Sequence, residues 1–406
     1  MGDFETILQE RPEGEQTSRG DSMSGTGNGN RDLRAGVVFM SIVYGGTGYA
    51  TEGWAEAVGL AQSQIPMQLI PIGPQHDSRR LLPASVRDTL EGLKRRKLDL
   101  ARSVVYQHGT ADGFNLNLHG RCRVGRTMFE SDRIPDGWAS QCNAMDEVWV
   151  PSEFNRQTFA FAGVDKHRLR LLPIGIDSSL FRPGCEPFPW PQARGFRFLS
   201  NFDWLDRKGM KVLLKAYLAE FKADEDVCLV LKIAQHGNRT ADAEAQLAYF
   251  IERETGLSLE KSPPIILVKG FIPHLEMPRL YASADAYVLA SHGEGFGLPY
   301  IEALACGLPV IATRWSGQLD FLHDGNSDLI DIEGLVPASP EVEFYAGHRW
   351  AQPSVEHLRQ LMRRVFSHPE EARARAALGR QEIVERWDWN PVLKRWADEF
   401  RRLLNQ

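Results

Sequence analysis

Short, largely apolar runs recur along the chain, and amphipathic or glycine-rich segments separate them. They lie at 36–42, 67–72, 103–106, 196–202, 227–233 and 286–290. Such a run is typical of a strand that is buried on both faces of a parallel sheet. Helical patterns follow most of these runs, so each half of the chain predicts a doubly wound α/β fold.

A segment rich in proline and glycine divides the chain of 406 residues into two halves, which suits two domains. We interpret this segment, 183–195, as a linker. One Rossmann-like domain is expected over 34–182 and a second over 196–385, with 386–406 forming a final helix. Residues 1–33 carry almost no apolar pattern and predict a disordered tail.

The stretch 286–313 predicts a strand, a glycine loop, a helix, a turn and another strand. Its loop contains three glycines, which let the backbone turn tightly and approach a ligand closely: Gly293, Gly295 and Gly297. Glu294 lies in this loop and Glu302 in the following helix. Two carboxylates therefore flank the start of a helix that can bind a ligand.

Polar or glycine residues follow three other predicted strands, where open α/β sheets bind ligands. Gly45 and Gly46 precede a helix, a layout that binds phosphate, although a tight turn without a ligand is the alternative. His108 could face a ligand or be an ordinary hydrogen-bonded histidine. Arg207 and Lys208 stand side by side before a helix and could hold a diphosphate, or they could belong to a plain charged loop.

Composition narrows the class of protein. The net charge of -6 and the pI near 6.0 argue against nucleic acid as the main partner. Five cysteines without a Cys-x-x-Cys pair indicate a reduced, cytosolic protein without a structural metal. The apolar run 37–44 is too short to span a membrane. The acidic run 224–226 precedes a strand and is interpreted as a solvated loop rather than a metal site.

Two segments lie outside the main pattern. The basic run Lys94–Lys97 lies within a predicted helix over 84–102. It is either a solvated face or a contact with anionic lipid or an acidic acceptor, so peripheral membrane contact stays open. Residues 333–353 contain many prolines, glycines and aromatic residues and predict an irregular segment.

Four motifs in order resemble those of the retaining glycosyltransferases of the GT-B fold, family 4, also called glycosyl transferases group 1. They are Pro173–Asp177, Arg207–Gly209, Gly270–Ile272 and the Glu-x7-Glu signature Glu294–Glu302. The resemblance spans roughly residues 35–405. It implies two facing Rossmann-like domains with the active site in the cleft between them. The first would bind the acceptor, the second the donor, and the final helix would return to the first domain.

The resemblance also implies roles for second-domain residues. Glu302 would accept hydrogen bonds from both ribose hydroxyls of the donor, and Glu294 from hydroxyls of the transferred sugar. Arg207 and Lys208 would neutralise the diphosphate leaving group, although family members usually carry an arginine where this chain has Asp203. The loop and the helix start would contact the sugar or the diphosphate through Gly295, Phe296, Gly297 and Leu298.

First-domain roles are implied in the same way. His108 would face the sugar, and Gly45 and Gly46 would contact the phosphate or the acceptor. Glu130, in an acidic segment near the cleft, is a candidate acceptor contact.

The implied reaction is the retaining transfer of a hexose from a UDP- or GDP-linked sugar to an acceptor hydroxyl, without a metal ion or a cofactor. The acceptor would be a glycan, a lipid-linked molecule or a small molecule, and the enzyme would act in the cytoplasm or at the inner face of the membrane. The alternatives are a catalytically idle scaffold or binding protein, a phosphorylase, and a nucleotide-dependent oxidoreductase or epimerase. The last is disfavoured because Glu294 would lie beside a pyrophosphate.

Overall fold

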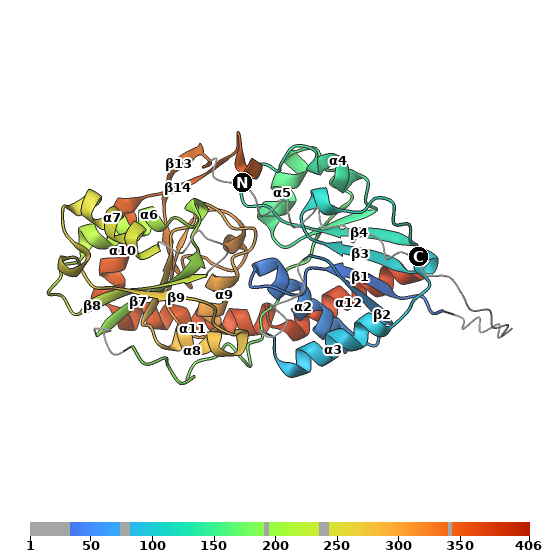
Figure 1. Ribbon diagram of the computed structural model, residues 1–406, viewed down its shortest axis with the longest axis horizontal. Coiled ribbons are helices and arrows are strands. Elements are labelled where there is room, and N and C mark those ends of the chain that lie inside the picture. The colour runs from blue at the N-terminus through green and yellow to red at the C-terminus, as the bar shows by residue number, and fades with distance from the viewer. Residues whose placement is uncertain (1–32, 74–81, 191–194, 235–242, 340–342) are drawn as a thin grey trace, which may run out of the picture.

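The computed structural model describes residues 33–73, 82–190, 195–234, 243–339 and 343–406. Two α/β domains lie side by side, the first in blue and green and the second in yellow to red (Figure 1). The tail expected over 1–33 falls, up to residue 32, outside the described residues.

The first domain is built on a six-stranded sheet of order β2-β1-β3-β4-β5-β6, in which all neighbouring strands are parallel. The strands are β1 Val37–Ser41, β2 Met67–Pro71, β3 Val104–His108, β4 Cys122–Arg126, β5 Glu147–Val150 and β6 Leu169–Leu171. The helices are α2 Gly48–Ala61, α3 Ala84–Arg95, α4 Trp138–Asn143 and α5 Glu153–Phe161. Helix α3 ends earlier than predicted, and a 3-10 turn, Leu100–Arg102, follows it.

The second domain repeats this plan with a parallel sheet of order β12-β11-β10-β7-β8-β9. The strands are β7 Phe196–Asp203, β8 Val227–Ala234, β9 Ile265–Lys269, β10 Ala286–Leu289, β11 Val310–Thr313 and β12 Asp328–Ile330. The helices are α6 Met210–Glu220, α7 Ala243–Thr255, α8 Met277–Ala282, α9 Leu298–Ala305, α10 Val355–Ser367 and α11 Pro369–Arg386. The two doubly wound sheets confirm the predicted fold class.

Helices cover both faces of each sheet, which explains why the strand sequences read as nearly continuous apolar runs. In the first domain, α2 and α3 pack on one face of the sheet and α4 and α5 on the other (Figure 1). One large cluster of buried residues forms the second-domain core.

The last helix, α12 Trp389–Asn405, leaves the second domain and packs on the first (Figure 1). Trp396 and Phe400 are buried there, and the Trp396 ring lies 5.3 Å from that of Trp149. The Trp396 indole also donates a hydrogen bond to the Pro173 carbonyl. The helix therefore completes the core of the first domain.

A hairpin also links the domains. Strands β13 Ile332–Pro337 and β14 Arg349–Pro353 pair antiparallel, so the prediction of an irregular segment over 333–353 was wrong. The pairing survives the prolines because they lie at the strand ends, and a register shift between Ile332 and Leu335 absorbs the irregularity. Tyr345 and Trp350 of this segment are buried with Phe129 and Trp138 of the first domain.

Candidate active site

The glycine loop before α9 lies where the two domains meet. Residues 291–297 are all buried, and Gly297 takes the left-handed conformation that starts α9. A Cβ atom on Gly293 would lie 2.0 Å from the Glu130 carbonyl oxygen, and one on Gly295 would lie 2.9 Å from Met128. Only glycine therefore allows the first-domain segment 128–130 to pack this closely on the loop.

Arg207 and Lys208 converge on Glu294. The Lys208 ammonium donates a hydrogen bond of 2.7 Å to Glu294 Oε1, and Arg207 Nη1 lies 3.3 Å from Oε2. Arg207 also donates to the Gly293 carbonyl. Gly209 allows this arrangement, because at φ +67° its Cβ would lie 1.7 Å from the Ala290 carbonyl oxygen. The 3-10 turn 206–208 is thereby seated on the end of β10.

The charges of Lys208 and Arg207 shift the pKa of Glu294. Burial would raise the pKa of Glu294, but the charges of Lys208 and Arg207 outweigh burial and leave that pKa below its ordinary value. Glu294 is therefore ionised at neutral pH. An ionised carboxylate that accepts hydrogen bonds suits sugar hydroxyls, and the two cations suit an anionic leaving group.

Glu302 lies on the buried side of α9 and has a different environment. Its Oε2 accepts a 2.7 Å hydrogen bond from the Tyr281 hydroxyl, which Asn201 approaches to 3.3 Å. Burial raises the pKa of Glu302 to about 7, against the lowering effects of Tyr281 and of the Lys232 charge. With a pKa near neutral pH, this carboxylate would be stabilised in its ionised form by a ligand that donates hydrogen bonds to it.

Lys232 is a neighbour of this site that sequence analysis missed. It lies near the carboxyl end of β8, is 8% exposed, and feels the charges of Asp203 and Glu302. Burial lowers its pKa. A lysine within a strand that is otherwise apolar was the available signal. Asp203 thus lies beside Lys232, whereas Arg207 reaches Glu294.

The glycine loop of the first domain lies opposite α9. Gly45, at φ +134°, and the exposed Gly46 precede Thr47, whose hydroxyl caps α2 by accepting from the Ala50 amide. A Cβ on Gly48 would lie 3.9 Å from Leu298 at the start of α9. The two glycine loops predicted to bind the donor therefore face each other.

His108 has the expected place at the end of β3, but it is fully buried in a network inside the first domain. Its Nδ1 lies 2.8 Å from Ser41 Oγ, and its Nε2 lies 3.3 Å from Glu52 Oε2. Glu52 accepts a 2.6 Å hydrogen bond from Arg126 Nε, and its side chain, like that of Arg126, is 0% exposed. Both ring nitrogens of His108 thus lie close to side chains of the first domain, and a sugar contact stays a prediction.

Glu130 lies at the domain boundary, where the sequence predicted a contact to the acceptor. The structure places it against Arg207 of the second domain, with Nη2 and Oε1 3.2 Å apart.

The described residues contain no group of three or more His, Cys, Asp or Glu side chains that could hold a metal ion. In the acidic run 224–226, Glu225 is paired with Arg363. All five cysteines are free thiols. Within the described part of the chain, no helix has the length and apolar character needed to cross a membrane.

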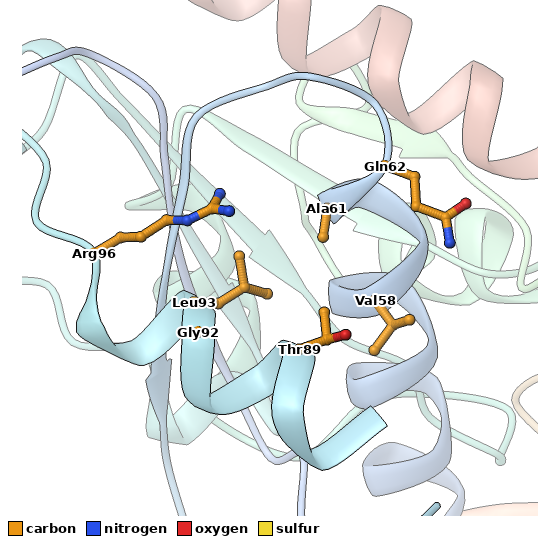
Figure 2. A pocket seen from close by; sticks show the side chains of 7 residues that line it. All are labelled: Val58, Ala61, Gln62, Thr89, Gly92, Leu93 and Arg96. Atoms are coloured by element: carbon orange, nitrogen blue, oxygen red, sulfur yellow. The ribbon is translucent and has the colours of Figure 1, made fainter. Parts of the chain in front are cut away.

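A cavity of about 350 Å³ lies away from these residues, between α2 and α3. Figure 2 shows Val58 and Ala61 on α2 facing Thr89 and Leu93 on α3, with Arg96 at one end. None of the predicted site residues lines it. Arg96 belongs to the basic run, in which Lys94 is paired with Glu91 while residues 95–97 are exposed.

Residues 193–346 match the family model described as glycosyl transferases group 1. The match covers most of the second domain, which is therefore similar to this family.

Curated relatives match parts of the chain. A D-inositol 3-phosphate glycosyltransferase 1 from Catenulispora acidiphila is 29% identical over 190 residues, which cover 45% of this chain and 44% of the relative. A GDP-mannose-dependent alpha-(1-6)-phosphatidylinositol monomannoside mannosyltransferase from Mycolicibacterium smegmatis is 24% identical over 265 residues, which cover 63% of this chain and 62% of the relative. The match spans less than half the length of the first of these relatives and under two thirds of the second.

Solved structures resemble most of the chain. Anabaena HepE in complex with UDP-glucose has a TM-score of 0.63 at 13% identity, covering 90% of this chain and 99% of HepE. Sucrose-phosphate synthase from Thermosynechococcus elongatus has a TM-score of 0.63 at 17% identity, covering 92% and 100%. These likenesses show that the chain has the GT-B fold, as predicted.

Proposed function

We propose that this chain is a retaining glycosyltransferase that moves a hexose from a nucleotide-diphosphate sugar to an acceptor hydroxyl without a metal ion. The observation that carries the proposal is the convergence of Arg207, Lys208 and Glu294 at the start of α9. A sugar diphosphate needs positive charge near its phosphates, which the two cations supply. It also needs a group that accepts hydrogen bonds from the sugar hydroxyls, which the ionised carboxylate of Glu294 supplies. The family match of the second domain supports the same activity.

The cations would act mainly on the leaving group. Negative charge on the diphosphate grows as the glycosidic bond breaks, so Arg207 and Lys208 stabilise the transition state more than the ground state. They supply the positive charge that a metal ion would otherwise bring. Glu294 would orient the sugar, and Glu302 would accept hydrogen bonds from the ribose. In a retaining reaction of this kind, the acceptor attacks from the face of the leaving group, and a donor phosphate oxygen takes its proton.

Both UDP- and GDP-linked donors are candidates. The name of the mycobacterial relative specifies GDP-mannose, and HepE was solved with UDP-glucose. The same mycobacterial name specifies a lipid-linked acceptor. We infer an acceptor that is a glycan, a lipid-linked molecule or a small molecule, reached from the cytoplasm or the inner face of the membrane.

Thermal unfolding of the purified chain with UDP-glucose, UDP-GlcNAc, UDP-galactose and GDP-mannose tests the proposal. A true donor should raise the midpoint by mass action, and the same donor should be hydrolysed or transferred. The anomeric configuration of the product, followed by NMR, should equal that of the donor. Binding without turnover would favour a catalytically idle binding protein. No binding to any of the four donors would contradict both the transferase and the binding-protein hypotheses.

A further inference from the structure

Glu130 is a first-domain carboxylate that lies on a cation of the second domain. Its Oε1 is 3.2 Å from Arg207 Nη2, and its Oε2 accepts a 2.8 Å hydrogen bond from the Tyr345 hydroxyl. The three residues come from the loop after β4, the turn after β7 and the turn of the β13–β14 hairpin. Glu130 is 19% exposed and Arg207 is 11% exposed, so water screens their attraction only in part.

The surroundings of Glu130 hold it in this position. The neighbouring Ser131 Oγ lies 2.7 Å from His348 Nδ1 of the hairpin. Asp132 and Arg349 exchange two hydrogen bonds, of 3.0 and 2.8 Å. Tyr345 itself is buried against the Phe129 ring, at 5.2 Å. The hairpin therefore aims the carboxylate of Glu130 at Arg207.

The contact between Glu130 and Arg207 changes the net charge of the candidate diphosphate site. Arg207 and Lys208 carry two positive charges, and Glu294 and Glu130 carry two negative charges within 3.3 Å of them. A donor diphosphate would bring two further negative charges to a cluster that is already neutral. Glu294 belongs to the same domain as the cations, whereas Glu130 belongs to the other domain.

We propose that Glu130 is a tethered anion that competes with the donor diphosphate for Arg207, and that Tyr345 holds it in place. The inference rests on the proposed function, because it takes the Arg207 site to be the diphosphate site. Donor binding then displaces Glu130 and breaks its contact between the domains. Glu130 sets the affinity for the diphosphate part of the donor and has no influence on the affinity for the nucleoside.

Calorimetric titration of wild type and Glu130→Gln with UDP, GDP, inorganic pyrophosphate and the nucleosides uridine and guanosine tests the proposal. The glutamine keeps the shape and still accepts from Tyr345, but it carries no charge. The dissociation constants of the nucleoside diphosphate and of pyrophosphate should both fall about tenfold, while that of the nucleoside stays unchanged. Tyr345→Phe should act in the same direction with about a threefold effect, because Glu130 loses only its positioning hydrogen bond.

Asp320→Ala is the control. It removes a contact between the domains, the 2.9 Å hydrogen bond from the Glu153 amide to the Asp320 carboxylate, without touching Glu130 or Arg207, so it should leave all these affinities unchanged. Equal or weaker diphosphate binding by Glu130→Gln would overturn the tethered-anion proposal and leave the proposed function standing. The same gain in Asp320→Ala would overturn it too, because loosening of the domains would then explain the effect. If neither wild type nor any variant binds a nucleotide or pyrophosphate, both proposals are overturned.

Discussion

Each domain holds a charged network, and the two networks differ in which domain supplies their partners. The second-domain network of Arg207, Lys208 and Glu294 is 7% to 11% exposed, and its partners include a residue of the other domain. In the first-domain network, the side chains of Glu52 and His108 are 0% exposed, and all partners lie in the same domain. Partners at the domain boundary can be replaced by a ligand, whereas partners in the interior mainly fix the fold. Similar residue types thus have different functions because of their burial.

Among these predictions, the largest effect is expected when one charge is removed from the first-domain network, and the quantity affected should be the stability of the fold. Glu52→Gln leaves Arg126 buried without its main counter-ion and should cost about 3–5 kcal/mol in the free energy of unfolding. Nucleotide affinity of the folded variant should be nearly unchanged. Urea unfolding and calorimetry measure the two quantities.

Glu56→Gln is the control for this prediction. Burial and the charge of Glu52 raise the pKa of Glu56 well above its ordinary value, so the protonated form is favoured. The amide can still accept the hydrogen bond from Tyr106, and the loss should be about 1 kcal/mol. If both variants lose the same stability, the distinction between these two buried carboxylates is wrong.

Removing a charge from the second-domain network should affect turnover instead. Lys208→Ala should lower kcat with the identified donor by about 10²–10³-fold, because a group that stabilises the leaving-group charge is lost. The thermal midpoint should fall less than in Glu52→Gln, because Arg207 still pairs with Glu294. Steady-state kinetics and thermal unfolding check this. A large loss of stability with normal kcat would assign Lys208 to the fold.

The pH dependence of donor binding should sharpen the comparison within the second domain. The ionised form of Glu302 is the better acceptor for two ribose hydroxyls, and its pKa is about 7. Protonation at lower pH removes that form, so the affinity for a nucleotide sugar should rise about tenfold between pH 6 and pH 8. Titration of wild type and Glu302→Gln measures this. The variant should bind weakly and without this pH dependence, and an equal slope in both would refute the ribose assignment.

The smallest expected effect concerns the basic run at the carboxyl end of α3. We expect Arg95, Arg96 and Lys97, which are exposed, to give weak binding to vesicles that contain anionic lipid. Reversing Arg95 and Lys97 to Glu should lower the partition coefficient about tenfold and leave donor turnover unchanged. Co-sedimentation with vesicles with and without anionic lipid checks this. Equal partitioning of both proteins would show that the run is an ordinary solvated face.

Sequence patterns indicated which second-domain candidate residues lie together better than they did for the first domain. Glu294, Arg207 and Lys208 could be connected because each follows a strand and parallel strands end at one edge of a sheet. His108 was also placed at a strand end, but its burial depends on Glu52, which lies on a helix far away in the sequence. Two carboxylates four residues apart on the apolar side of α2, Glu52 and Glu56, were the signal for a buried network.

The hairpin and its contacts could not be predicted. Its pairing joins two short segments across an irregular register, and its aromatic residues pack on a domain that is distant in the sequence. Tyr345 and Lys232 obtain their importance from such long-range contacts. Local patterns carry no information on them, because apolar periodicity reports which residues are buried and not what covers them.

The return of α12 to the first domain has a consequence for synthesis of the protein. Val392, Trp396 and Phe400 belong to the core of a domain whose strands all lie before residue 172. A ribosome translates the entire second domain before it adds these residues. The core of the first domain therefore stays incomplete until the end of translation, after the second domain has been synthesised. A premature stop near the end of the message would therefore damage the domain that is made first.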